Sequence, residues 1–188
     1  PDSQTDIFAG YQHKLFGLYG MYTGDLYTAF NPYESENIKT SLFILNHDRK
    51  YGEGSSFEIT AYHRENSDHY LFNRFSPNQN FVHDSMVSSV GVSGLHTFDE
   101  RVALNYGIQI TSDEIESSSL ENGTFTNRNY YKVSLLPEYR LLIDAKESLT
   151  FKGGISWDDT SRDKSTMSTI AEISWIRDGL DGNSERTY

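Results

Sequence analysis

The sequence predicts an all-β fold of antiparallel strands, and three features of its 188 residues support this class. The stretch RVALNYGIQITSDE at 101–114 alternates apolar residues with small or polar ones over ten positions, which is the pattern of an extended strand with two different faces. No comparable stretch has a helical period with caps, and the chain contains only four prolines. Several such stretches separated by turn residues indicate antiparallel neighbours.

Eight segments have the character of strands. In chain order they are 6–17 (DIFAGYQHKLFG), 37–48 (NIKTSLFILNHD), 55–66 (SSFEITAYHREN), 84–97 (DSMVSSVGVSGLHT), 101–115, 128–142 (RNYYKVSLLPEYRLL), 148–158 (SLTFKGGISWD) and 168–177 (STIAEISWIR). Alternation is clearest in the fifth, sixth and seventh. Their apolar positions are Val102, Leu104, Tyr106, Ile108 and Ile110, then Tyr131, Val133, Leu135, Pro137, Tyr139 and Leu141, then Leu149, Phe151, Ile155 and Trp157. A polar stripe along the opposite face fits the interior of a membrane barrel and also the outside of a soluble sandwich.

The connections between the segments favour the membrane barrel. Short turns follow the second, fourth and sixth segments, at RKYGEG (49–54), FDE and IDAKE. Longer connections follow the first, third and fifth, at 18–36, 67–83 and 116–127, with a more modest TSRDKSTM after the seventh. Outer-membrane barrels alternate short periplasmic turns with long external loops in this way. Soluble sandwiches follow no such rule.

Composition limits the function classes. The chain is 36% hydrophobic with a mean hydropathy of −0.60, and its longest apolar runs, such as LFIL at 42–45, are far shorter than the roughly 20 residues of a spanning helix. A net charge of −11 argues against nucleic acid as a partner. Cysteine is absent, so disulfides and thiolate metal sites are excluded. Tyrosine (13) and phenylalanine (11) are abundant, which fits strands and the aromatic girdles of barrels.

Several stretches resemble the wall of TonB-dependent outer-membrane receptors. They are FAGYQHKLFG, SLFILNHDRKYGEGSSFEITAYHRENSDHYLFNRF, YYKVSLLPEYRL and ISWDDTSRDKSTMSTIAEISW. Within the family the chain is most similar to cobalamin-transporter receptors. The resemblance implies a segment from a barrel of about 22 strands, whose plug domain and TonB box lie outside these residues. The C-terminal DGLDGNSERTY, a turn followed by the start of a further strand, also suggests a piece of a larger barrel.

The first long loop, LYGMYTGDLYTAFNPYESE, is the candidate ligand-binding segment. It concentrates five aromatic residues, Tyr19, Tyr22, Tyr27, Phe30 and Tyr33. Flat aromatic side chains supply contact area at a low entropy cost, which suits capture of a bulky ligand. They suit an aromatic girdle at the membrane surface equally well.

Carboxylates in a second predicted loop, Asp158, Asp159 and Asp163, are a candidate Ca²⁺ site, because calcium prefers hard oxygen ligands. A similar run holds Asp113, Glu114 and Glu116. Neither run matches an EF-hand, and calcium-ordered loops occur in the receptors that the chain resembles. The alternative is a solvated acidic rim. No other cofactor is expected.

No catalytic residue is expected. Histidine lies near a carboxylate at His47, His63 and His69, a pairing that can orient a general base. However, no serine sits in a G-x-S-x-G nucleophile elbow.

We therefore expect residues 1–188 to be a segment of a bacterial outer-membrane β-barrel that takes part in TonB-dependent uptake of a scarce solute such as cobalamin or a siderophore. Val102, Leu104, Tyr106, Ile108 and Ile110 should face lipid, and Asn105, Gln109 and Thr111 the lumen. The expected partners are the bilayer and lipopolysaccharide, the plug and remaining strands, the solute, and the TonB complex through residues outside this chain. The alternatives are a soluble β-sandwich that binds a ligand such as carbohydrate, and a small closed eight-stranded outer-membrane barrel.

Overall fold

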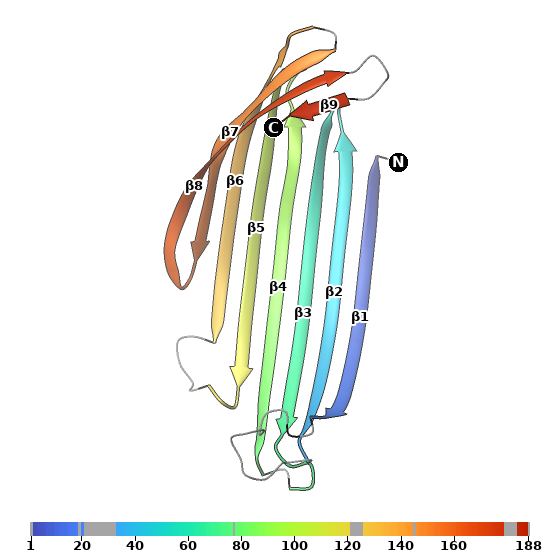
Figure 1. The fold of residues 1–188 in the computed structure, drawn as a ribbon, viewed down its shortest axis with the longest axis vertical. Coiled ribbons are helices and arrows are strands. Elements are labelled where there is room, and N and C mark those ends of the chain that lie inside the picture. The colour runs from blue at the N-terminus through green and yellow to red at the C-terminus, as the bar shows by residue number, and fades with distance from the viewer. Residues whose placement is uncertain are drawn as a thin grey trace.

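The computed structural model describes residues 2–18, 20, 33–76, 78–120, 126–144, 146–178 and 184–187. These residues form one antiparallel sheet in which the strands lie side by side in chain order (Figure 1). The strands are β1 (Ser3–Gly17), β2 (Ser35–Tyr51), β3 (Ser55–Leu71), β4 (Asn80–Thr97), β5 (Val102–Ser117), β6 (Asn127–Leu142), β7 (Glu147–Thr160), β8 (Asp163–Asp178) and the short β9 (Ser184–Thr187). The described part of the chain contains no helix that is long and apolar enough to cross a membrane.

The eight predicted strands and their antiparallel order are confirmed, and each strand is longer than or shifted from its expected range. β1 to β8 contain 14 to 18 residues each, and β4 is the longest. β3 continues to Leu71, past the expected end at residue 66, because its polar end still pairs with both β2 and β4. β9 pairs with the end of β8, as the C-terminal turn and strand start predict.

The alternation of long and short connections holds for the first six and fails at the seventh. Long connections join β1 to β2, β3 to β4 and β5 to β6, and short ones lie at 52–54, 98–101 and 143–146. β7 and β8 are joined only by residues 161 and 162, so the expectation of a longer segment there is wrong. The two strands pair as far as Thr160 and Asp163, so the polar residues that were expected to form the loop belong to the ends of β7 and β8 instead.

Two neighbouring rows of the ladder show that the sheet has one apolar and one polar face. The first row runs directly across β1 to β8 through Thr5, His47, Ile59, Val92, Ile108, Val133, Trp157 and Met167. The row beside it, on the opposite face, runs through Asp6, Asn46, Thr60, Gly91, Gln109, Lys132, Asp158 and Thr166. We call the side of Ile108 the apolar face and the side of Gln109 the polar face. The predicted division of 102–111 between two faces is thus confirmed.

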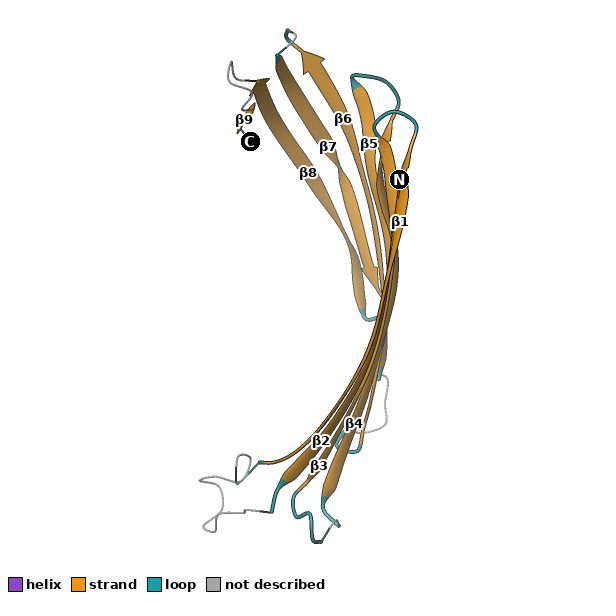
Figure 2. Cartoon of the chain, turned by 90° about the vertical axis from the view of Figure 1, so that its right-hand side faces the viewer, coloured by secondary structure: helices purple, strands orange, loops and turns teal. Residues whose placement is uncertain are grey.

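The apolar face has nothing packed against it among the described residues. Figure 2 shows the sheet as a single curved layer. The only large apolar side chain that is buried in the described part of the chain is Leu18, whereas Ile108 and Ile173 are 53% and 59% exposed. A soluble sandwich would cover such a face with a second sheet.

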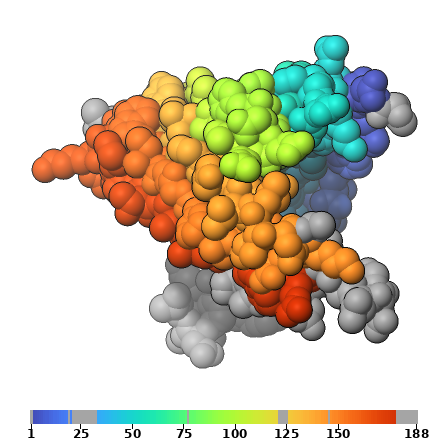
Figure 3. All heavy atoms as spheres, turned by 90° about the horizontal axis from the view of Figure 1, so that it is seen from above, coloured from blue at the N-terminus to red at the C-terminus, as the bar shows by residue number. Residues whose placement is uncertain are grey.

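The sheet curls toward its C-terminal strands, as the end-on view shows (Figure 3). Thr150, Ser156 and Ser174 of β7 and β8 are buried, and all three lie on the polar face, which is therefore the inner side of the curl there. The β6–β7 ladder is interrupted at Leu136 and Pro137, where Pro137 has no N–H to donate and Gly154 lies so close to the backbone of Leu135 that a Cβ would overlap it.

Among the described residues, both edges of the sheet are open. β1 pairs only with β2, and β9 covers β8 only from Trp175 to Asp178. The described strands therefore do not close into an eight-stranded barrel. β1 also lacks proline and bulges, devices with which soluble proteins protect an edge strand.

Candidate functional site

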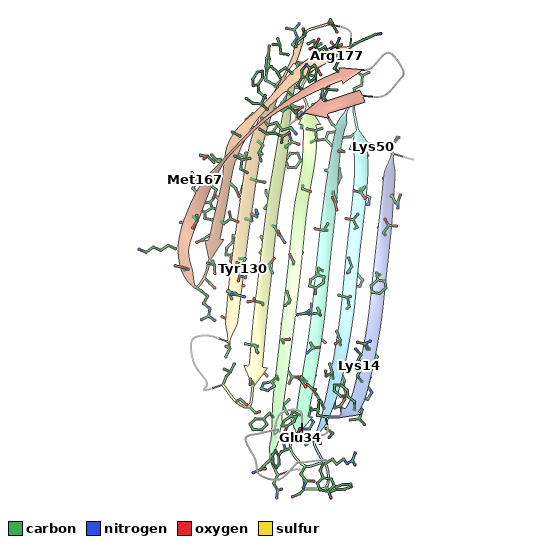
Figure 4. All side chains as sticks on the ribbon, viewed as in Figure 1. Lys14, Glu34, Lys50, Tyr130, Met167 and Arg177 are labelled. Atoms are coloured by element: carbon green, nitrogen blue, oxygen red, sulfur yellow. The ribbon has the colours of Figure 1, made fainter. Side chains whose placement is uncertain are left out.

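The long connections gather at one end of the sheet, which we call the loop end, and the short turns at the other, the turn end. Figure 4 shows Lys14 and Glu34 at the loop end and Lys50 and Arg177 at the turn end. Of the five aromatic residues predicted to bind a ligand, Tyr19, Tyr22, Tyr27 and Phe30 lie outside the described residues. Tyr33 is described, and it lies at the loop end, two residues before the start of β2.

Tyr33 belongs to a small aromatic and cationic cluster. Its ring meets the edge of Phe75 at a centroid distance of 5.5 Å, and the guanidinium carbon of Arg74 lies 5.1 Å from the Phe75 centroid. The N–H of Arg74 donates to the carbonyl of Tyr33 at 3.0 Å, which ties the β3–β4 connection to the start of β2. Phe75 remains 72% exposed and Tyr33 45%. This geometry offers a flat apolar surface with a positive charge beside it.

Carboxyl groups line the polar face next to this cluster. Glu34 is fully buried and Glu36 is nearly so. Burial, followed by the neighbouring carboxylate of Asp68 and a hydrogen bond with it, raises the pKa of Glu36 above its ordinary value of 4.5. The two side chains lie on adjacent strands, since Glu36 pairs with Tyr70 and Asp68 with Ile38.

Other strands complete this end of the polar face. In the ladder row of Asp68, Lys14 of β1 lies two strands away and His83 of β4 lies directly opposite. His83 Nδ1 is 2.6 Å from Ser117 Oγ, and the rings of Tyr70 and Phe81 stack at 6.0 Å.

Sequence reasoning identified Tyr33 but missed Arg74, Phe75, Glu36 and Asp68. All four lie at strand ends or in a connection, where alternation gives no signal. Their common position at the long-connection end is the one cue that the sequence offered.

The three aspartates of the predicted Ca²⁺ site do not converge. Asp158 lies on the polar face, where it accepts a hydrogen bond from Ser156 Oγ (3.1 Å) and lies 3.9 Å from Lys132 Nζ. Asp159 is the next residue of the strand and pairs with Tyr131 on the apolar face. Asp163, the first residue of β8, accepts a hydrogen bond from the N–H of the next residue, Lys164. Across the described ranges, no group of three or more histidine or acidic side chains could hold a metal ion.

The second acidic run is divided in the same way. Asp113 accepts a 2.6 Å hydrogen bond from Arg128 on the polar face. Glu114 and Glu116 line a hollow on the apolar face.

Balanced charges cross the polar face nearer the turn end. One ladder row joins Glu138, Lys152 and Glu172, with Lys152 Nζ 3.8 Å and 3.6 Å from the two carboxylates. Arg140 lies 3.7 Å from Glu138, which also accepts a hydrogen bond from Asn105. Such a surface is built for contact with water or a polar body and is unfavourable against hydrocarbon.

A serine, a histidine and a carboxylate do meet on the apolar face. His63 Nδ1 is 2.8 Å from Ser88 Oγ, and Nε2 is 3.3 Å from Glu65 Oε1. The ladder continues on both sides of Ser88, so the backbone N–H groups around it are engaged in sheet pairing. This arrangement lacks the free backbone donors that would stabilise an oxyanion.

Comparisons of the chain with protein-family models, with curated proteins and with solved structures find no match.

Proposed function

We propose that the chain is part of the wall of a transmembrane β-barrel in a bacterial outer membrane. The two adjacent ladder rows carry this proposal, because one presents apolar side chains on one face from β3 to β8 and the other presents polar residues, with one glycine, on the opposite face from β1 to β8. Strands of 14 to 18 residues exceed the roughly 9–11 that cross a bilayer. They are also longer than most strands of soluble proteins.

The uncovered apolar face favours a barrel over a soluble sandwich. Ile7, Leu135 and Ile173, on strands near the two edges and between them, are 65%, 44% and 59% exposed. An apolar surface of this extent is unfavourable in water and favourable against acyl chains. The open edges favour a larger barrel over a closed eight-stranded one, because unpaired backbone groups are costly in lipid.

Within this class, we infer that the barrel belongs to a receptor for TonB-dependent uptake of a scarce solute. The support is the resemblance of the strand sequences to that family and the exposed cluster of Tyr33, Arg74 and Phe75 at the loop end. The partners would be lipopolysaccharide, a plug domain and further strands, and a TonB complex that contacts residues outside this chain. The solute would be captured without chemical change.

The experiment that tests the barrel is extraction of the native protein from membranes. We expect it to remain in the membrane fraction after high-salt and carbonate washes and to stay monodisperse only in detergent. A protein that is monodisperse without detergent would overturn the proposal, and the aromatic cluster would then belong to a soluble binding face.

A further inference from the structure

The apolar side chains of the apolar face form a band that crosses the ladder rows obliquely. On β1 the band extends from Ile7 to Tyr11, between Thr5 and His13, and Leu15 is a separate apolar residue beyond it. On β8 it includes one polar residue, Thr169. The stretches that alternate in this way are 7–11 on β1, 43–45 on β2, 57–61 on β3, 90–94 on β4, 102–110 on β5, 131–141 on β6, 149–157 on β7 and 167–175 on β8.

The centre of the band moves steadily from the loop end toward the turn end across the sheet. The ladder row of Ile108 passes through Thr5 on β1 and Met167 on β8. The band is centred on Ala9, four residues toward the loop end from Thr5, and on Ala171, four residues toward the turn end from Met167. A shift of eight residues is about 27 Å, and the seven strand spacings between β1 and β8 add up to about 34 Å. The band is therefore inclined to the ladder rows by about 40°.

This inclination is the one that a membrane wall requires. A bilayer is flat, so an apolar band that follows it makes the strands tilt from the membrane normal by the same angle, and barrel strands tilt by about 35–45°. The stretches 102–110, 149–157 and 167–175 each contain nine residues. At a tilt of about 40° they span about 23 Å, close to the apolar belt of about 25 Å around membrane barrels. The inclination also explains why Thr5 and His47 are polar in the row of Ile108, because both lie outside the band.

Aromatic side chains mark the two ends of the band. Tyr11, Tyr131 and Trp157 are its last members toward the loop end, and the next residue on the same face is polar in each strand. At the turn end, Trp175 donates its indole N–H to Glu147 at 2.7 Å. Tyrosine and tryptophan are enriched at membrane–water interfaces, where the ring meets acyl chains and the polar atom meets water or a polar group.

We propose that the acyl chains of the bilayer cover this oblique band, with the membrane midplane along a line from Ala9 to Ala171 that passes close to Ile108. The proposal rests on the membrane wall proposed above and assigns the depth of each strand within it. Residues of one ladder row then lie at different depths. Asn129 shares the row of Ala9 but lies five strand spacings away, which places it about 15 Å shallower on a row inclined by about 40°.

Electron paramagnetic resonance of single nitroxide labels in the intact protein, reconstituted into phosphatidylcholine vesicles, tests this placement. The 188 residues contain no cysteine, so one introduced cysteine carries the only label among them. Relaxation by oxygen, which concentrates among acyl chains, is compared with relaxation by a water-soluble nickel complex. Ala9→Cys and Ala171→Cys, both at exposed positions, should give the same high oxygen-to-nickel ratio. Asn129→Cys should give a low one.

The matched control is Ala103→Cys, an alanine on the polar face in the row of Glu138, which should show no preference for oxygen. Equal ratios at Ala9 and Asn129, with a lower one at Ala171, would mean that the membrane follows the ladder rows, which overturns the oblique band and leaves the barrel intact. Labels at Ala9 and Ala171 that neither reagent reaches would mean that a second protein covers the face, and would overturn the proposal. Nickel access without oxygen preference at all three positions would refute the barrel itself.

Discussion

Neighbouring residues of one strand meet different surroundings in this protein, and β5 gives the sharpest contrast. Ile108 is more than half exposed on the apolar face, and Asn105 lies on the polar face beside Glu138. If the sheet stood in water, an arginine at either position would be tolerated. In a membrane wall, only the position on the polar face would tolerate it.

We therefore predict that Ile108→Arg destabilises the protein by about 2–4 kcal/mol in lipid vesicles, the cost of an arginine near the bilayer midplane. Asn105→Arg is the control on the opposite face and should change the unfolding free energy little, because Glu138 can pair with it. Urea unfolding of both variants in vesicles measures the difference. Equal and small effects would contradict a lipid-facing Ile108.

Glu36 gives a second prediction at the scale of the residue. Because its pKa is raised in the folded protein, the native state holds a proton that the unfolded chain releases. The stabilisation is complete below the ordinary value of 4.5 and is lost as the pH rises through the raised pKa. Glu36→Gln keeps an uncharged group at every pH, so it should raise the urea midpoint at pH 7 and leave it nearly unchanged at pH 4.

The control for this prediction is Glu100→Gln, an exposed turn residue whose midpoint should not depend on pH in the same way. A Glu36→Gln variant that is less stable than the native protein at pH 7 would mean that the carboxylate is ionised and paired.

At the scale of the element, the contact between β6 and β7 depends on glycine. A side chain at Gly154 would overlap the carbonyl oxygen of Leu135, whereas a Cβ at Gly153 meets nothing within 4 Å. We predict that Gly154→Val costs about 1–3 kcal/mol or more, because the two backbones must separate. Gly153→Val should be nearly neutral. The yield of folded protein and its urea midpoint measure both effects, and similar values for the pair would refute the close approach.

The strands could be predicted from the sequence because alternation is a local signal that the pleat of a sheet imposes. Their ends could not, because β3 and β8 continue through polar residues that are held only by pairing with neighbouring strands. The unpredicted extension of a strand also explains why the aspartates of the candidate calcium site do not converge. Asp158 and Asp159 are consecutive, and once β7 extends to Thr160 they must face opposite sides of the sheet.

The candidate ligand site was only partly predictable. Tyr33 was identified by its aromatic neighbours in the sequence, but its contacts with Arg74 and Phe75 join segments about forty residues apart. The pairing of β2 with β3 brings these segments together, and no local pattern encodes that proximity.

At the scale of the whole molecule, the open edges of the sheet leave backbone N–H and C=O groups without a neighbouring strand among the described residues. The backbone groups on the outer edge of β1, and those on β8 before Trp175, have no partner strand among the described residues. In hydrocarbon each unsatisfied group costs several kcal/mol, so a stable membrane wall must pair both edges. The proposed membrane location therefore requires that the sheet continue into further strands.

This requirement predicts that the native particle is several-fold larger than the 21.5 kDa of this chain. Intact mass under denaturing conditions distinguishes two ways of meeting it. A large denatured mass would mean that the further strands belong to the same polypeptide, as the receptor proposal requires. A denatured mass near 21.5 kDa within a large native particle would mean that separate chains complete the barrel. A native monomer of 21.5 kDa in lipid would leave both edges unpaired and would refute the membrane wall altogether.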